Sequence, residues 1–76
     1  MERASKREIQ FVSSLKRRKD RWEQNAFAVE GLKMVLELLQ TDLSLQQVYM
    51  SDSMASESLP ARIVSTHPKL MSDRDF

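Results

Sequence analysis

The residues of this sequence best suited to binding chemistry are a dense run of cations, Lys16-Arg17-Arg18-Lys19 and Arg21. Arginine guanidinium groups bind phosphates through paired N–H donors, and lysine ammonium groups bind them as point charges. Residues 1–22 contain eight Lys and Arg against three Asp and Glu, whereas residues 23–76 contain four against eight. This segregation of charge is typical of a surface that binds a polyanion, and the alternative interpretation is a solvated helix face without a ligand.

None of the other polar residues forms a pattern that predicts catalysis or metal binding. His67 is the only histidine, and no further metal ligand lies at helical or hairpin spacing from it. The serines lack the base and the orienting group that a nucleophilic serine needs. A single glycine, Gly31, cannot form a glycine-rich phosphate loop. We therefore expect no catalytic, cofactor-binding or metal-binding residue in this chain.

Length and composition predict one small domain over residues 1–76. No apolar run approaches the roughly 20 residues that a membrane span requires, so we expect no membrane association. The amino-terminal residues include Glu2 and Glu8 and lack the apolar stretch of a secretory signal. The chain contains no cysteine, so no disulfide is possible, and a cytoplasmic location is the expectation.

The cations are predicted to lie on a long amino-terminal helix that ends at Trp22. Ser5 and Glu8 fit a capping box, in which each side chain accepts a hydrogen bond from the other residue's backbone amide. Most of the cations are expected opposite a broad apolar face, whose residues recur at three- or seven-residue steps. These apolar residues are Ile9, Val12, Leu15 and Trp22. We expect Trp22 to pack in the core, and the alternative is that it stacks on an unpaired base.

Helices and strands are predicted to alternate through the rest of the chain. The predicted elements are a turn at 23–25, strands at 27–30, 45–50 and 62–65, and helices at 32–39, around 54–55 and from 68 onward. The helix at 32–39 is expected to be largely buried, and Gly31 before it permits a positive φ or a close approach of strand and helix. The fold class is therefore predicted to be α/β, with three short, mostly parallel strands flanked by helices.

Several of these segments together form a recognisable pattern. A Phe27-Ala28-Val29-Glu30-Gly31 core follows a basic helix and precedes the apolar helix Leu32–Leu39. Three shorter segments continue it: Val48-Tyr49-Met50, Ile63-Val64-Ser65 and Leu70-Met71. Over most of its length the chain resembles the amino-terminal RNA substrate-binding domain of SpoU-type, TrmH-like RNA 2′-O-ribose methyltransferases of the SPOUT class. One departure is Asn25-Ala26, where that family often has a glycine.

The resemblance implies a small three-layer α/β/α sandwich, similar to the large-subunit ribosomal proteins that bind kink-turn RNA. It also implies that the basic helix docks RNA, with rRNA or tRNA as the partner. The residues expected to contact RNA are Lys6, Arg7, Lys16, Arg17, Arg18 and Arg21. In such enzymes a following knotted domain binds S-adenosylmethionine, methylates a ribose 2′-hydroxyl and provides most of the homodimer contact. We expect those functions to lie outside residues 1–76.

Two other functions are compatible with the same residues. One is a free-standing RNA-binding protein of ribosomal type, without a methyltransferase domain. The other is a protein-interaction module, in which the Leu- and Met-rich helix at 32–39 pairs with a partner or with a second copy of the chain. Salt-dependent affinity for RNA separates the RNA-binding functions from the protein-interaction module.

Overall fold

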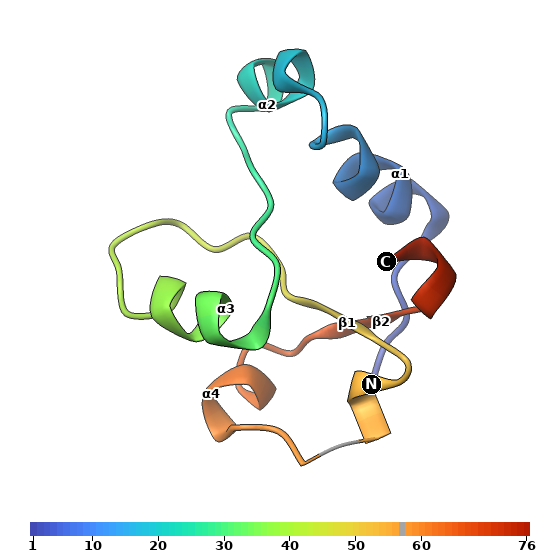
Figure 1. The fold of residues 1–76 in the computed structure, drawn as a ribbon, viewed down its shortest axis with the longest axis vertical. Coiled ribbons are helices and arrows are strands. Elements are labelled where there is room, and N and C mark those ends of the chain that lie inside the picture. The colour runs from blue at the N-terminus through green and yellow to red at the C-terminus, as the bar shows by residue number, and fades with distance from the viewer. Residues whose placement is uncertain (57) are drawn as a thin grey trace.

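The sheet of this protein joins its two ends. The computed structural model describes residues 1–56 and 58–76. Strand β1 (Tyr49–Ser51) pairs in parallel with β2 (Lys69–Met71). On the other side of β2, the Leu70 N–H donates to the Glu2 carbonyl and the Leu70 carbonyl accepts from the Ala4 N–H, each at 2.7 Å. Strand β2 therefore lies between β1 and the amino-terminal segment (Figure 1).

Most of the described residues in regular secondary structure lie in helices and not in the small sheet. The α-helices in the described residues are α1 (Lys6–Ser14), α2 (Arg18–Gln24), α3 (Leu32–Leu38) and α4 (Ala61–Val64), and the 3₁₀ helices are η1 (Met54–Ser56) and η2 (Asp73–Asp75). Helix α2 lies at one end of the long axis of the molecule, and α4 lies toward the opposite end (Figure 1). The α/β class and the parallel pairing are confirmed. The expected third strand is not formed in the described residues, where two strands pair and Arg3 adds a single bridge.

The long amino-terminal helix is interrupted, which corrects the prediction of a continuous helix up to Trp22. Helix α1 ends at Ser14, whose hydroxyl donates to the Phe11 carbonyl at 2.6 Å. Such a bond to the preceding turn competes with regular helical pairing. The backbone N–H groups of residues 15–17 then donate to carbonyls three residues earlier, as in a 3₁₀ turn. Arg17 itself is extended, with φ −93° and ψ 134°. In a continuous helix, Lys16 and Lys19 would also form a like-charge pair three residues apart, and Arg17 and Arg21 one four residues apart, which is unfavourable.

The segment after α2 is extended but does not join the sheet, so the predicted strand at 27–30 is wrong. In the described part of the chain, residues 27–30 make no backbone hydrogen bond to either strand. Gly31 then begins α3 with φ +99°, a value that glycine adopts at low cost, as predicted. Helix α3 forms where expected, but none of its residues is buried, so the prediction of a largely buried helix is also wrong.

The order of helix and strand is reversed near the carboxyl terminus. Residues 61–64, expected as part of a strand, form α4, and residues 69–71, expected in a helix, form β2. The β-branched pair Ile63-Val64 favours a strand intrinsically, but Ile63 is buried at 2% exposure on α4, and this packing overrides that preference. His67 has a left-handed φ of 54° and turns the chain into β2, instead of beginning a helix.

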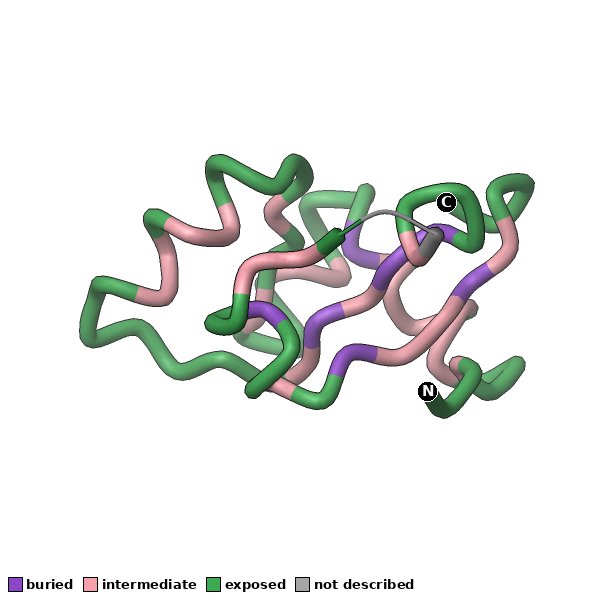
Figure 2. Tube along the Cα trace, turned by 90° about the horizontal axis from the view of Figure 1, so that it is seen from below, coloured by how far each residue is buried: buried purple, intermediate pink, exposed green. Residues whose placement is uncertain are grey.

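The core is small and gathers around the strands (Figure 2). Its buried apolar residues are Leu15, Val48, Met50, Ile63 and Met71. Trp22 is 75% exposed and Phe27 is 58% exposed, so the prediction that Trp22 packs in the core is wrong. The interruption after α1 explains this difference, because it breaks the periodicity that would align Trp22 with the buried Leu15.

Candidate nucleic-acid interface

A capping box at the start of α1 also anchors this helix to the sheet. The Glu8 N–H donates to Ser5 Oγ at 3.1 Å, and the Ser5 N–H donates to Glu8 Oε1 at 3.0 Å, as predicted. The second carboxylate oxygen, Glu8 Oε2, accepts from the Tyr49 hydroxyl at 2.9 Å and from Lys69 Nζ at 3.0 Å. One side chain therefore caps α1 and connects it to both strands.

This Glu8 cluster satisfies its charges internally. The hydrogen bond from the Ser5 amide, followed by those from Lys69 and Tyr49, lowers the pKa of Glu8 to about 2. Burial, together with the bond to Glu8, raises the pKa of Tyr49 to about 12, and the Glu8 carboxylate raises the pKa of Lys69. Lys69 is only 23% exposed, so it serves the fold and not a ligand.

Arg21 fixes the orientation of helix α2. Its Nη1 donates to the carbonyl of Leu15 at 3.0 Å and to the carbonyl of Lys16 at 2.9 Å, which satisfies two acceptors at the end of α1. The other end of α2 closes on Asn25, which has φ 50°, and the Ala26 N–H donates back to the Arg21 carbonyl at 3.1 Å. This pattern is a Schellman motif, in which asparagine tolerates the left-handed conformation. Helix α2 is therefore held at both ends.

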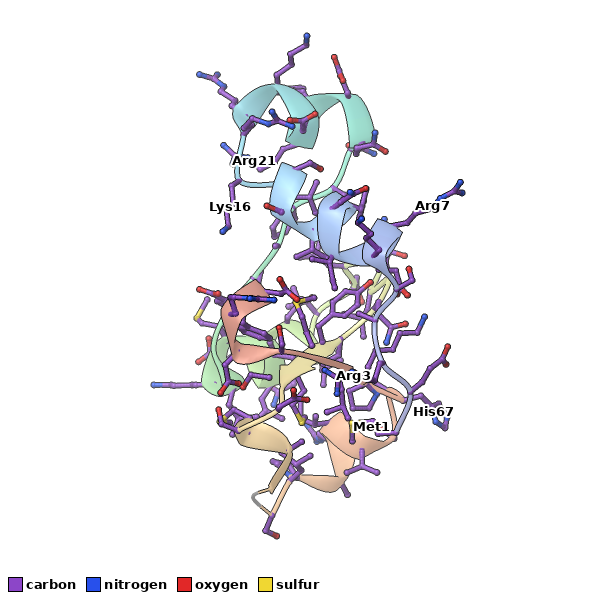
Figure 3. All side chains as sticks on the ribbon, turned by 90° about the vertical axis from the view of Figure 1, so that its right-hand side faces the viewer. Met1, Arg3, Arg7, Lys16, Arg21 and His67 are labelled. Carbon is purple, nitrogen blue, oxygen red and sulfur yellow. The ribbon has the colours of Figure 1, made fainter. Side chains whose placement is uncertain are left out.

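The structure divides the six cations predicted to contact RNA into two groups. Lys6 and Arg7 lie in the first turn of α1, whereas the other four lie where α1 passes into α2. Arg7 and Lys16 extend to opposite sides of α1 (Figure 3). The six residues therefore do not form one continuous face. We call the second group the junction cations: Lys16, Arg17, Arg18 and Arg21.

The junction cations differ in how far their charges are already satisfied. Arg17 Nε pairs with Asp20 Oδ2 at 2.6 Å, and Arg21 is engaged with the two carbonyls at the end of α1. Lys16 and Arg18 are exposed and make no ion pair within the described residues. Their charges are free for an external anion. The same holds for Lys6 and Arg7 on α1.

Sequence reasoning missed two features of this surface. Lys19, which was not among the predicted contacts, is exposed on α2 and lies 3.9 Å from Glu23, a weak exposed pair. Trp22, expected in the core, is the most exposed large apolar side chain in the described residues. The sequence signal for both is their spacing. Arg18 lies four residues and Lys19 three residues before Trp22, so the three side chains are neighbours on one side of a helix.

The described residues contain no group of three or more His, Cys, Asp or Glu close enough together to hold a metal ion. None of the described helices has the length and apolar character needed to cross a membrane. A Cβ placed on Gly31 would meet no atom within 4 Å, so glycine is favoured at this position by its positive φ and not by close packing.

Comparison with known families gives one result that covers most of the chain. Residues 6–72 match the MRM3-like substrate binding domain. Neither the curated proteins nor the solved structures include a match to the chain. The match starts with α1 and extends past β2, so it includes both the Glu8 cluster and the junction cations. The chain therefore belongs to the MRM3-like substrate-binding domain family, the substrate-binding domains of SpoU-type RNA methyltransferases.

Proposed function

We propose that this chain binds the RNA substrate of its methyltransferase through the junction cations. The observation that supports this proposal is that some junction cations have internal partners and others have none within the described residues. Arg21 holds α2 in place, while Lys16 and Arg18 extend into solvent without a partner in the described residues. Unpaired exposed cations on a fixed support are suited to phosphates, because each neutralised phosphate releases condensed counterions. Lys6 and Arg7 supply a second, separate point of contact on α1.

The reaction that this binding serves is transfer of a methyl group from S-adenosylmethionine to a ribose 2′-hydroxyl. This assignment rests on the resemblance to SpoU-type enzymes and on the family of the chain. None of the residues described above is assigned to S-adenosylmethionine. In this proposal a separate domain holds the cofactor and forms the homodimer, and the RNA is rRNA or tRNA.

The test compares two charge-reversed variants with the same net charge. One variant combines Lys16→Glu with Arg18→Glu, and its control combines Lys33→Glu on α3 with Arg62→Glu on α4. All four cations are exposed, and none makes an ion pair within the described residues. Each variant changes the formal charge of the chain from +1 to −3, so that only the position of the charge differs.

We expect the variant at the junction to bind structured RNA at least about tenfold more weakly, with a salt slope reduced by about 1.4 to 1.8 for two lost phosphate contacts. The control should lose only a fewfold of affinity, because charges farther than about 8 Å from a phosphate are largely screened at physiological salt. Equal losses in the two variants would show that RNA responds to net charge alone, which contradicts the proposed site. Circular dichroism checks that both variants fold.

A further inference from the structure

Trp22 is exposed in a position where burial would be the ordinary outcome for a large aromatic side chain. Its exposed fraction is 75%, compared with 6% for Leu15 at the end of α1. Indole is large, flat and apolar, so leaving it in water forgoes the burial free energy that a small core needs most. The exposed indole therefore offers a flat apolar surface that is available to a partner, and its neighbours decide which kind of partner fits.

The charges around Trp22 indicate which kind of partner. On a helix with 100° per residue, Arg18 lies about 40° to one side of Trp22 and Lys19 about 60° to the other. Arg18 has no ion-pair partner in the described residues, and Lys19 has only its distant pair with Glu23. A flat π surface between two cations matches a nucleotide, which presents a flat base next to a phosphate. An apolar protein partner would have to desolvate both cations.

The support beneath Trp22 is fixed before any ligand binds. Arg21 joins α2 to the end of α1 through two hydrogen bonds, and the Schellman motif at Asn25 closes the helix immediately after it. The Asn25 N–H donates to the Trp22 carbonyl itself at 3.3 Å. The backbone that holds the indole is therefore already ordered, which lowers the entropy cost of binding.

We propose that Trp22 is a stacking platform for an unpaired base of the bound RNA, with Arg18 and Lys19 contacting the phosphates on either side. The inference rests on the proposed RNA-binding function and adds a substrate class to it. The preferred RNA contains a single-stranded stretch or a loop, because bases stacked inside a duplex are not accessible to a side chain. Stacking of this kind is tolerant of base identity, so Trp22 selects unpaired RNA and not a sequence.

The chain provides its own probe, since Trp22 is its only tryptophan. We would titrate the 76-residue protein with an oligouridylate of about 12 nucleotides and with an RNA duplex of the same length, and record both affinity and tryptophan fluorescence. The variants are Trp22→Ala, Trp22→Leu and Trp22→Phe, with Met34→Ala as the control. Met34 is 52% exposed on α3 and has no cation three or four residues away, so it matches the loss of exposed apolar surface alone.

Three results are expected. The single strand quenches the fluorescence of Trp22 in step with binding, and the duplex does not. Trp22→Ala and Trp22→Leu each weaken binding of the single strand about 5- to 150-fold, whereas Trp22→Phe retains most of the affinity because it keeps a π face. Met34→Ala binds like the unchanged protein. Together these results would assign Trp22 to base stacking.

Other results would overturn the inference in distinguishable ways. Single-strand binding that persists in Trp22→Ala, without quenching in the unchanged protein, leaves the proposed function intact and removes the stacking role. Absence of binding to either RNA removes the proposed function itself. Concentration-dependent self-association that Trp22→Ala abolishes and Trp22→Leu retains would identify the patch as a contact between copies of the chain.

Discussion

Two clusters of charged residues in this protein use the same side-chain types for opposite purposes. In the Glu8 cluster, one carboxylate accepts from Tyr49 and Lys69 across the contact between α1 and the sheet, and every charge has an internal partner. At the junction of α1 and α2, Lys16 and Arg18 have no ion-pair partner within the described residues. The difference shows that partnership and burial, more than residue type, separate a structural cation from one that can bind a ligand.

The comparison extends to two apolar residues on either side of the junction, Leu15 and Trp22, and the largest expected effect is there. Leu15 is 6% exposed and Trp22 is 75% exposed. We expect Leu15→Ala to lower the free energy of unfolding by about 2–5 kcal/mol, because it leaves a cavity in the core. Trp22→Ala should change it by no more than about 0.5 kcal/mol. Urea unfolding followed by circular dichroism measures both.

If Leu15→Ala does not fold, Leu15→Val provides a milder form of the same test, with an expected loss of about 1 kcal/mol. A loss for Trp22→Ala as large as that for Leu15→Ala would mean that the tryptophan is packed in solution. The contrast between the two regions would then disappear.

A second prediction separates two arginines three residues apart on α2. Arg21→Ala should lower the free energy of unfolding by about 1 kcal/mol, since two carbonyls at the end of α1 lose a charged donor in a half-buried position. Arg18→Ala should leave stability unchanged within about 0.5 kcal/mol and weaken RNA binding instead. Urea unfolding and RNA titration of both variants would show this crossed pattern. Equal effects on stability would contradict the division between the two residues.

The Glu8 cluster predicts a loss of stability in acid. The pKa of Glu8 is lowered from 4.5 to about 2 in the folded state, so its contribution is fully present above pH 4.5 and is lost as the pH falls toward 2. Asp52, whose pKa is lowered by Arg3, acts in the same direction. We expect Glu8→Gln to reduce the fall in melting temperature between pH 5 and pH 2, with Asp42→Asn as a control at an exposed carboxylate. An unchanged acid profile in Glu8→Gln would contradict the role of the cluster.

The smallest effect is a spectroscopic shift at alkaline pH. Tyr49 is the only tyrosine, so its ionisation can be followed directly by absorbance of the phenolate. Its pKa is raised from 10.0 to about 12, so its contribution to stability is intact below pH 10 and is lost as the pH rises toward 12. We expect Glu8→Gln to move the absorbance midpoint down toward 10, with circular dichroism confirming that the chain is still folded. A midpoint near 10 in the unchanged protein would argue against both the burial of Tyr49 and its bond to Glu8.

Local features of this fold were predictable from sequence, and features that depend on distant partners were not. The capping box of Ser5 and Glu8, the start of α3 after Gly31 and the 3₁₀ helix near residue 54 all depend on neighbouring residues, and all three are confirmed. The elements at 61–64 and 69–71 were exchanged because β2 takes its partners from β1 and from residues near the amino terminus. No local pattern contains that information.

The candidate site was predictable in the same limited sense. Residue types and charge segregation indicated the amino-terminal cations as candidates, and their contact with RNA stays a prediction. Their separation into structural and unpaired groups depends on single hydrogen bonds, such as the one from Arg21 to the Leu15 carbonyl. The position of Trp22 followed from the interruption between α1 and α2, which adjacent serines and cations produce together.

The bridge between Arg3 and Leu70 has a consequence for the order in which the protein folds. The two residues are separated by 67 positions, so almost the whole chain must close into a loop before β2 acquires both of its neighbours. On the ribosome, α1 can form early because its capping box is local. Residues 2–4, which precede α1, stay unpaired until residues 69–71 have emerged. The pairing of residues 2–4 with β2 therefore cannot form until residues 69–71 are available, and the sheet is completed late.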